Sequence, residues 1–252
     1  ACGGKKDADK TDRITVPKDP FPSTYAAYPN DPVFISNATV IDGEGALIEK
    51  GSLLIVDGKI SAIGKDLEAP ADAKKIDASG RWVTPGIIDN HSHLGAYPSP
   101  GVSSLSDGNE ISAPVTAEVW VEHSVWPQDP GFSRALAGGI TSLQILPGSA
   151  NLFGGRGVVL KNVPSRTVQG MKFPGAPYTL KMACGENPKR VYGYGGGRYP
   201  GGAPYSRMGN VAGYRAAWIQ ATDYKRKWDK YEKEGGEAPT RDLELDTLKG
   251  VL

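Results

Sequence analysis

The residues best suited to chemistry are two histidines that stand one residue apart at the end of an apolar run. They lie in WVTPGIIDNHSHLG, residues 82 to 95, where Ile87 and Ile88 predict a buried strand. Alternate residues of a strand point to the same face, so His91 and His93 would stand about 6.6 Å apart along it. Two imidazoles at that separation can share one ion at Zn–N bonds of about 2.0 to 2.1 Å. The chain has only 3 histidines, and the spacing of this pair predicts a metal site.

We expect no metal-binding role for the remaining histidine or the two cysteines. His123 lies in the polar stretch VEHSVWPQD, where we expect an ordinary surface or packing role. Cys184 has no second cysteine at the spacing of a thiolate site, so we expect a buried thiol. Cys2 follows a small residue and precedes Gly-Gly and a charged run, as at the end of a bacterial lipoprotein signal peptide. Lipidation of Cys2 and a plain disordered N-terminus both remain open, because Ala1 precedes the cysteine.

The region before the histidine pair is rich in β-branched residues and tight turns. The runs VFISNATVID, SLLIVDG, KISAIG and KKIDASGRWVTPG predict a small β-domain over residues 33 to 85. Asp57-Gly58 lies between two apolar runs and predicts a hairpin. Upstream, residues 1 to 32 predict a disordered and then extended tether, since a charged run without apolar periodicity is followed by several prolines.

Beyond His93 the patterns of strands and helices alternate. A polar loop over residues 97 to 114 comes first. We then expect a helix at 130 to 137, strands at 140 to 146, 158 to 160 and 178 to 184, an amphipathic helix at 207 to 234, and a helix that begins near 243. The run ITSLQIL at 140 to 146 is typical of a parallel strand. The glycine-rich stretch 192 to 209 lacks the GK[ST] of a phosphate loop, so we interpret it as a surface or active-site loop.

Composition narrows the classes of partner. The chain has 252 residues, enough for one large domain or two smaller ones. Lys+Arg of 29 against Asp+Glu of 28 gives a net charge of +1, so there is no whole-chain electrostatic case for nucleic acid or an anionic membrane. No stretch approaches the roughly 20 apolar residues that span a bilayer.

Four motifs stand out along the chain: PGIIDNHSHLG (85 to 95), SDGNE (106 to 110), FSRALAGGITSLQILPGSANLFGG (132 to 155) and LKMACGENPKRVYG (180 to 193). Together they resemble the N-terminal half of metal-dependent amidohydrolases, most closely the secreted imidazolonepropionase-like group. The resemblance implies an α/β fold, with a small β-sandwich over residues 33 to 85 and the first half of a (β/α)₈ TIM-like barrel over 86 to 252. Barrel enzymes keep their sites at the C-terminal ends of the strands.

The resemblance implies a divalent metal cofactor, one or two ions with zinc as the expected metal, held by His91 and His93 on the first barrel strand. It also implies a carboxylate or a carboxylated lysine at the end of the third or fourth strand. Glu186 follows LKMACG as such a ligand should and would complete a set of three protein ligands. The alternatives are that Glu186 caps the turn at Asn187-Pro188 and that a carboxylated Lys181 is the ligand.

Members of this family supply two further histidines and a catalytic aspartate from later barrel strands. The sequence ends at Leu252, before any of them, so we expect no catalytic residue in this chain and no activity from it alone. We expect a fragment, or one half of a cleaved or two-subunit enzyme, whose partner is the C-terminal half. An open half-barrel exposes strand edges, so the chain alone should be insoluble or co-purify with that half.

The implied reaction is metal-assisted hydrolysis of a C–N bond in an amide, cyclic amide or peptide-like substrate. Residues that follow candidate barrel strands would bind this small molecule or peptide; they are Tyr97, Asn109, Glu110, Asn151 and Arg156. An alternative from another class is a non-catalytic binding or assembly subunit of a cell-envelope complex. The expected location is the bacterial cell envelope, as a periplasmic or outer-membrane lipoprotein, or outside the cell; a homo-oligomer is a further expectation.

Overall fold

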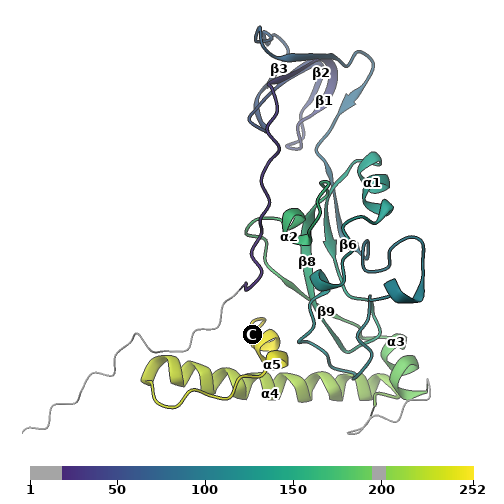
Figure 1. The fold of residues 1–252 in the computed structure, drawn as a ribbon, viewed down its shortest axis with the longest axis vertical. Helices are drawn as coiled ribbons and strands as arrows, with labels where there is room; N and C mark the ends of the chain where they lie inside the picture. The colour runs from purple at the N-terminus through teal and green to yellow at the C-terminus, as the bar shows by residue number, and fades with distance from the viewer. Residues whose placement is uncertain (1–18, 195–202) are drawn as a thin grey trace, which may run out of the picture.

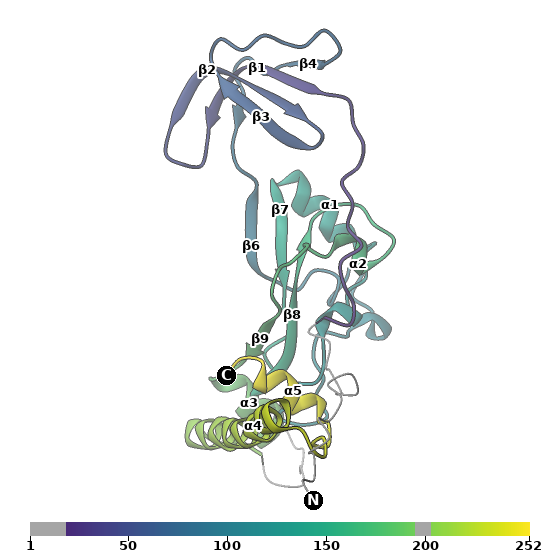
Figure 2. The same ribbon diagram turned by 90° about the vertical axis from the view of Figure 1, so that its left-hand side faces the viewer.

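The computed structural model describes residues 19 to 194 and 203 to 252 as two β-rich parts joined end to end (Figure 1). A small sheet forms one end, and an α/β part follows it. The long helix α4 runs crosswise beneath the α/β part, with α5 stacked on it. Strand β6 continues from the small sheet into the larger part (Figure 2), so the two parts meet just before the histidine pair.

The N-terminal sheet has five strands. They are β1 (Val33–Ile41), β2 (Leu47–Val56), β3 (Lys59–Gly64), β4 (Lys74–Asp77) and β5 (Trp82–Val83). The order is β3-β2-β1-β4, with β5 also paired to β1. Asp57 and Gly58 both have positive φ, 50° and 70°, as a two-residue hairpin between β2 and β3 requires. The strands and the hairpin that the sequence predicts here are confirmed.

This part of the chain supplies one sheet, whereas the resemblance implies two packed sheets. One face has a small core of Ala38, Val40, Leu53 and Ala78. Large apolar side chains nevertheless remain exposed on these strands, namely Leu47, Ile60, Ile63, Ile76 and Trp82. A sandwich buries such residues between two sheets, and within the described residues the region from 33 to 83 forms only one.

The α/β part is built on a four-stranded sheet in the order β6-β7-β8-β9. Its strands are β6 (Ile87–Ser92), β7 (Ile140–Ile145), β8 (Phe153–Lys161) and β9 (Thr179–Met182). β6 and β7 are parallel, as predicted, and the helix α1 (Pro130–Ala137) lies between them in the chain. β8 is antiparallel to both of its neighbours. The connection from β7 to β8, residues 146 to 152, is shorter than the dozen or so residues of a parallel crossover, so these strands form a hairpin.

Seven short and long helices complete the described chain. They are η2 (Ser103–Leu105), η3 (Val121–His123), α2 (Val168–Met171), α3 (Glu186–Pro188), η4 (Lys189–Gly193), α4 (Arg207–Glu234) and α5 (Leu243–Lys249). The bounds of α4 are those that the sequence predicts, and Ser206 caps its first turn by accepting from Gly209 N. Among the described residues, no helix combines the length and the apolarity needed to cross a membrane.

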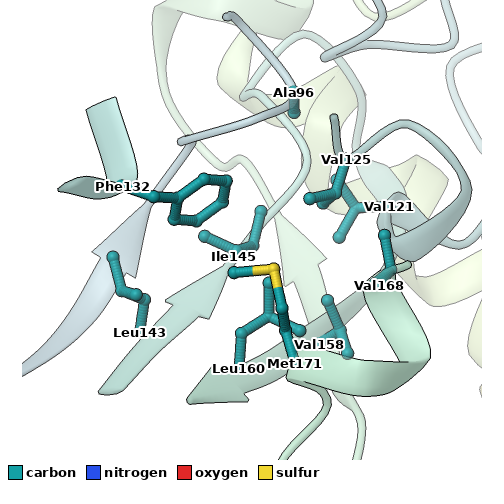
Figure 3. Packing of buried hydrophobic residues seen from close by; sticks show 10 residues of the cluster. All are labelled: Ala96, Val121, Val125, Phe132, Leu143, Ile145, Val158, Leu160, Val168 and Met171. Atoms are coloured by element: carbon teal, nitrogen blue, oxygen red, sulfur yellow. The ribbon is translucent and has the colours of Figure 1, made fainter. Parts of the chain in front are cut away.

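The two faces of the α/β sheet differ in polarity. On one face, apolar residues of β7 and β8 pack against α1, α2 and the region around η3 (Figure 3). The cluster is Ala96, Val121, Val125, Phe132, Leu143, Ile145, Val158, Leu160, Val168 and Met171. On the other face, Gln144 Nε2 donates to Thr179 Oγ1 at 2.8 Å. The polar face therefore remains available for a site, and the helices cover the apolar one.

Two expectations about burial are wrong. Ile87 and Ile88 are 53% and 71% exposed, and β6 is an edge strand of the sheet that the described residues form. Cys184 is an exposed free thiol. It lies past the end of β9, where Asn210 of α4 donates to its backbone carbonyl and the thiol itself is exposed.

The N-terminal segment, residues 19 to 32, is extended and forms hydrogen bonds to the α/β part. Residues 19 to 32 contain no helix or strand, yet Thr24 N donates to Gln169 O at 3.0 Å and the Tyr28 hydroxyl to Pro164 O at 2.5 Å. The segment therefore lies along the α/β part (Figure 1) rather than acting as a plain tether. The predictions for Cys2 and for the charged run near it fall outside the described residues.

Candidate metal site

The histidine pair lies at the C-terminal end of β6. His91 is in the strand and His93 follows it directly, with ring centroids 5.4 Å apart and ring planes at 82°. His93 Nδ1 is 2.8 Å from Leu146 O. A carbonyl oxygen can only accept, so Nδ1 carries the hydrogen, and in the neutral ring Nε2 keeps its lone pair. This orientation is the one that a metal ligand needs.

Lys181 of β9 brings its amine to the same place. Its Nζ lies 3.2 Å from His91 Nε2, although the residue is only 9% exposed. Burial lowers the pKa of the Lys181 ammonium, because a poorly hydrated site disfavours its charge. None of the ion pairs formed by the described residues includes Lys181. A buried amine without a carboxylate partner thus faces the two imidazoles.

Glu186 does not join this group. It begins α3, its side chain is 66% exposed, and Oε1 lies 3.7 Å from Arg190 Nε. In the described part of the chain, no group of three or more His, Cys, Asp and Glu side chains could hold a metal ion. The geometry therefore does not support the set His91, His93 and Glu186, because the chain turns away after β9. Lys181, the alternative, is the residue that reaches the pair.

Asp129 positions the turn after His93, and the sequence reading did not single it out. Its carboxylate is buried and accepts from Gly95 N at 2.9 Å and from Ser99 N at 3.3 Å. It also accepts from Gly131 N at 2.9 Å, which caps α1. An aspartate directly before a proline marks a helix start, so the cap could have been found from the sequence. The bond to Gly95 could not, because it joins segments far apart in the chain.

Tyr97 and Asn109 lie beside the histidines. Tyr97 lines a shallow hollow of about 380 Å³ together with His91 and His93. Its ring meets the His93 ring edge-on, with centroids 5.7 Å apart. Asn109 Nδ2 donates to the Tyr97 hydroxyl and Asn109 Oδ1 accepts from Ala150 N. Burial raises the pKa of Tyr97. These two of the predicted substrate-binding residues are therefore placed at the candidate site.

The other three predicted substrate-binding residues lie elsewhere or serve the scaffold. Asn151 is 1% exposed, and its amide donates to Glu110 O and Thr116 Oγ1. Glu110 accepts from Ser112 N within its own loop. Arg156 pairs with Leu180 across β8 and β9, whereas Lys181 pairs with the neighbouring Gly155. Paired residues share a face, so Arg156 points to the side of the sheet opposite Lys181.

Comparisons with known proteins found amidohydrolases, dihydroorotases and deaminases as relatives. No protein-family profile matches the chain. Amidohydrolase tasK of Hapsidospora irregularis is 36% identical over 223 residues, which cover 82% of this chain and 22% of that protein. A dihydroorotase of Geotalea daltonii is 38% identical over 115 residues, 46% of this chain and 22% of that protein. A 5-methylthioadenosine/S-adenosylhomocysteine deaminase of Pyrococcus furiosus is 31% identical over 102 residues, 40% of this chain and 22% of that protein.

A solved structure matches most of the fold. The crystal structure of an amidohydrolase from Thermotoga maritima superposes with a TM-score of 0.79 at 38% identity and covers 87% of this chain and 55% of that one. The chain therefore spans about half of that solved protein and about a fifth of the curated relatives. The predicted fold, the N-terminal part of a barrel of this type, is confirmed. Similarity of this extent in both sequence and fold means that the chain belongs to the metal-dependent amidohydrolase superfamily.

Proposed function

We propose that the chain supplies the first part of a metal-dependent site that hydrolyses a C–N bond in an amide, cyclic amide or peptide-like substrate. One observation carries the proposal: a buried lysine amine lies 3.2 Å from His91 Nε2, beside a second histidine whose free nitrogen is set by a backbone carbonyl. The relatives support the class of bond, since they are named amidohydrolase, dihydroorotase and deaminase.

The residues present fit a divalent metal ion. His91 and His93 offer imidazole nitrogens, and two imidazoles leave room for a further protein ligand. A neutral Lys181 amine can add to carbon dioxide, forming an N–C bond and releasing one proton, and the resulting carbamate offers oxygen ligands. The absence of any carboxylate partner for Lys181 among the described ion pairs fits this role. We propose His91, His93 and carboxylated Lys181 as the ligands, with zinc as the expected ion.

The chain's own residues would orient the substrate. A bound divalent ion would supply a water whose pKa is lowered to about 7 and would polarise a carbonyl. The Tyr97 hydroxyl accepts from Asn109, so its own hydrogen is free to donate to a substrate oxygen in the shared hollow. Leu146 O and Asp129 hold His93 and the turn after it in place. These contacts support Tyr97 as the proposed substrate-binding group beside the expected metal.

We further propose that a C-terminal half supplies the remaining metal ligands and the proton-transfer aspartate. The support is that the chain spans only 55% of the Thermotoga protein that shares its fold. Lipid attachment at Cys2 and a place in the cell envelope remain predictions, which mass spectrometry of the native N-terminus would test. A lipid adduct on Cys2 would support both, and an unmodified cysteine would contradict the anchor.

Metal content tests the proposal directly. The complete protein, purified without chelators, should contain a stoichiometric divalent metal by inductively coupled plasma mass spectrometry. Changing His91→Ala, His93→Ala or Lys181→Met should each remove most of it, since a ligand set of three loses one member. Glu186→Gln is the matched control and should retain the metal, because Glu186 is exposed and paired with Arg190.

Two results would contradict the proposal. A complete protein without stoichiometric metal would favour the non-catalytic binding or assembly subunit instead. Loss of metal in Glu186→Gln but not in Lys181→Met would return the third ligand to Glu186. If metal is present, a panel of amides, cyclic amides and dipeptides assayed with the complete protein identifies the bond that is cleaved.

A further inference from the structure

A second and larger hollow lies on the helix-covered side of the α/β sheet. Its volume is about 1490 Å³. The N-terminal segment, the residues around η3, the strand β8, the stretch before β9, and α5 all contribute to its walls. Among the described residues that line it, none is His91, His93 or Lys181. The proposed metal ligands are therefore outside this hollow, although Asn109, which donates to Tyr97 beside the histidines, lines it as well.

Arg156 of β8 is fixed inside this hollow. Its Nε donates to Thr247 Oγ1 of α5 at 2.9 Å. The guanidinium carbon lies 4.3 Å from the ring centroid of Trp120 and 5.7 Å from that of Tyr178. Three separate segments thus hold one guanidinium, and little further ordering would be needed for it to bind a ligand.

The Nη1 and Nη2 nitrogens of Arg156 have no hydrogen-bond acceptor within residues 19 to 194 and 203 to 252. Nε is the only nitrogen of Arg156 that donates to the protein there, so the four N–H groups on Nη1 and Nη2 remain available. Burial also lowers the pKa of Arg156, because the charged group has lost hydration. Arg156 is half-buried and lines the hollow, so a ligand bound there can provide acceptors for these N–H groups.

The other cations of the lining are already neutralised. Lys172 Nζ lies 3.0 Å from Asp19 Oδ1 and 3.0 Å from Glu122 Oε2. Arg241 Nε and Lys249 Nζ lie 2.7 and 3.9 Å from the carboxylate of Asp246. Among the described residues that line the hollow, Arg156 is therefore the lysine or arginine without an ion pair.

The residues around Arg156 favour one chemical class of ligand. The two outer nitrogens of a guanidinium match the two oxygens of a carboxylate. Arg156 is the one lysine or arginine of the described lining without an ion pair, so the hollow offers a ligand a single unpaired positive charge. Phe21, Trp120 and Tyr178 offer aromatic surface for an apolar body. We propose that Arg156 anchors the carboxylate of a monoanionic ligand with an apolar or aromatic body, either an N-acyl amino acid or the free carboxyl end of a short peptide.

Paired ligands that differ only in charge test this inference. Isothermal titration of the complete protein with N-benzoylglycine and with its uncharged amide should show binding of the acid at least about tenfold tighter, the range of a charge-assisted hydrogen bond. The tripeptide Ala-Ala-Phe with a free or an amidated C-terminus distinguishes a peptide from a small acid. Inorganic phosphate should bind more weakly than either acid. Equal affinity for acid and amide, or preference for phosphate, would overturn the proposal.

Variants then assign the binding to Arg156. Arg156→Met keeps an apolar side chain over Trp120 and should weaken N-benzoylglycine at least about tenfold, with Arg156→Lys in between. Arg166→Met, at an exposed position outside the lining, is the matched control and should bind as the wild type. His91→Ala should also bind normally, so the result does not depend on the metal proposal. Unchanged binding in Arg156→Met, or loss in His91→Ala, would refute the site. If Arg156→Met fails to fold, Arg156→Lys with the acid and amide pair decides.

Discussion

Lys172 joins the N-terminal segment to the α/β sheet through a buried charge cluster. Its Nζ contacts the carboxylates of Asp19 and Glu122, and it also donates to Phe21 O and the Tyr178 hydroxyl. The Glu122 side chain is 0% exposed. Lys172→Met would leave that carboxylate buried without a cation, and breaking a buried pair in this way costs about 3 to 5 kcal/mol. Urea unfolding should show a loss of free energy of unfolding of this size.

The partners of Lys172 provide the controls. Asp19 is 35% exposed, so Asp19→Asn should cost only about 0 to 1 kcal/mol, as partly solvated pairs do. Removing both buried charges in Lys172→Met with Glu122→Met should recover much of the loss. If Lys172→Met alone unfolds at the same urea concentration as the wild type, the cluster does not stabilise the fold.

Glu244 makes stability depend on pH. Burial, together with the like charges of Glu118 and Asp242, raises its pKa from 4.5 to about 7. The folded protein then holds a proton that the unfolded chain releases, so this contribution to stability is fully present below about pH 4.5 and is lost as pH rises through about 7. We expect the free energy of unfolding to fall between about pH 5 and pH 8, and Glu244→Gln to reduce that fall.

Urea unfolding at several pH values measures this effect. Glu234→Gln, which changes an exposed carboxylate at the end of α4, should keep the pH dependence of the wild type. Glu118→Gln should weaken it, since that charge contributes to the shift of Glu244. A wild-type stability that rises from about pH 5 to pH 8, and that Glu244→Gln does not alter, would contradict the assignment.

The predicted metal site shows which contacts between residues can be inferred from the sequence. His91 and His93 could be found because their relation is local: two positions of one strand share a face whatever the rest of the chain does. Lys181 stands 90 positions from His91. The contact between Lys181 and His91 depends on the order of the four strands and on which face of β9 carries Lys181. The residues next to Lys181 in the sequence do not determine either feature. Glu186 follows the same strand, where the resemblance implies a carboxylate or a carboxylated lysine, and the turn into α3 leaves its side chain exposed beside Arg190.

At the scale of elements, one carboxylate couples a helix to the turn that follows the histidine pair. Asp129 caps α1 through Gly131 N and holds the turn after His93 through Gly95 N. Gly95 has φ of 78°, and an added Cβ would lie 2.7 Å from Val125 Cγ1, so a larger residue would be strained in this turn. Asp129→Ala should cost about 1 to 3 kcal/mol through the lost cap and the unsatisfied amides.

The same change should also affect the site. Residues that orient metal ligands typically contribute 10- to 100-fold to metal affinity, so Asp129→Ala should weaken zinc binding by about that factor in a competition assay with a chelator. Ser133→Ala, on the exposed side of α1, is the matched control. A stability loss in Asp129→Ala with unchanged zinc affinity would limit the residue to capping.

The elements themselves were predictable to different degrees. The bounds of α4 follow from its own periodicity and its Ser206 cap, so local sequence is sufficient. The direction of β8 was not foreseen because a short apolar run looks alike in both directions. The exposure of Ile88 was missed for a related reason: the residue types predict a buried strand, but burial depends on a neighbouring strand that pairs with β6.

At the scale of the whole molecule, the α/β sheet is open at β6. This strand pairs only with β7 in the described part of the chain, and Ile87 and Ile88 are largely exposed on it. Exposed apolar edge strands promote association with other strands. The Thermotoga protein with the same fold is longer than this chain, which covers 55% of it. The C-terminal half that we propose is the polypeptide expected to cover this edge.

Expression of residues 1 to 252 alone tests the open edge. We expect the chain to aggregate, or to elute from size exclusion as a complex when the C-terminal half is co-expressed. Ile88→Lys should make the isolated chain more soluble, because charge on an edge strand opposes pairing, and should weaken capture of the C-terminal half. Ile219→Lys, at a position on α4 that is 60% exposed, is the matched control and should leave that capture unchanged. A soluble, monodisperse wild-type monomer that binds no C-terminal half would show that β6 is a tolerated edge, and the incomplete-barrel proposal would then fail.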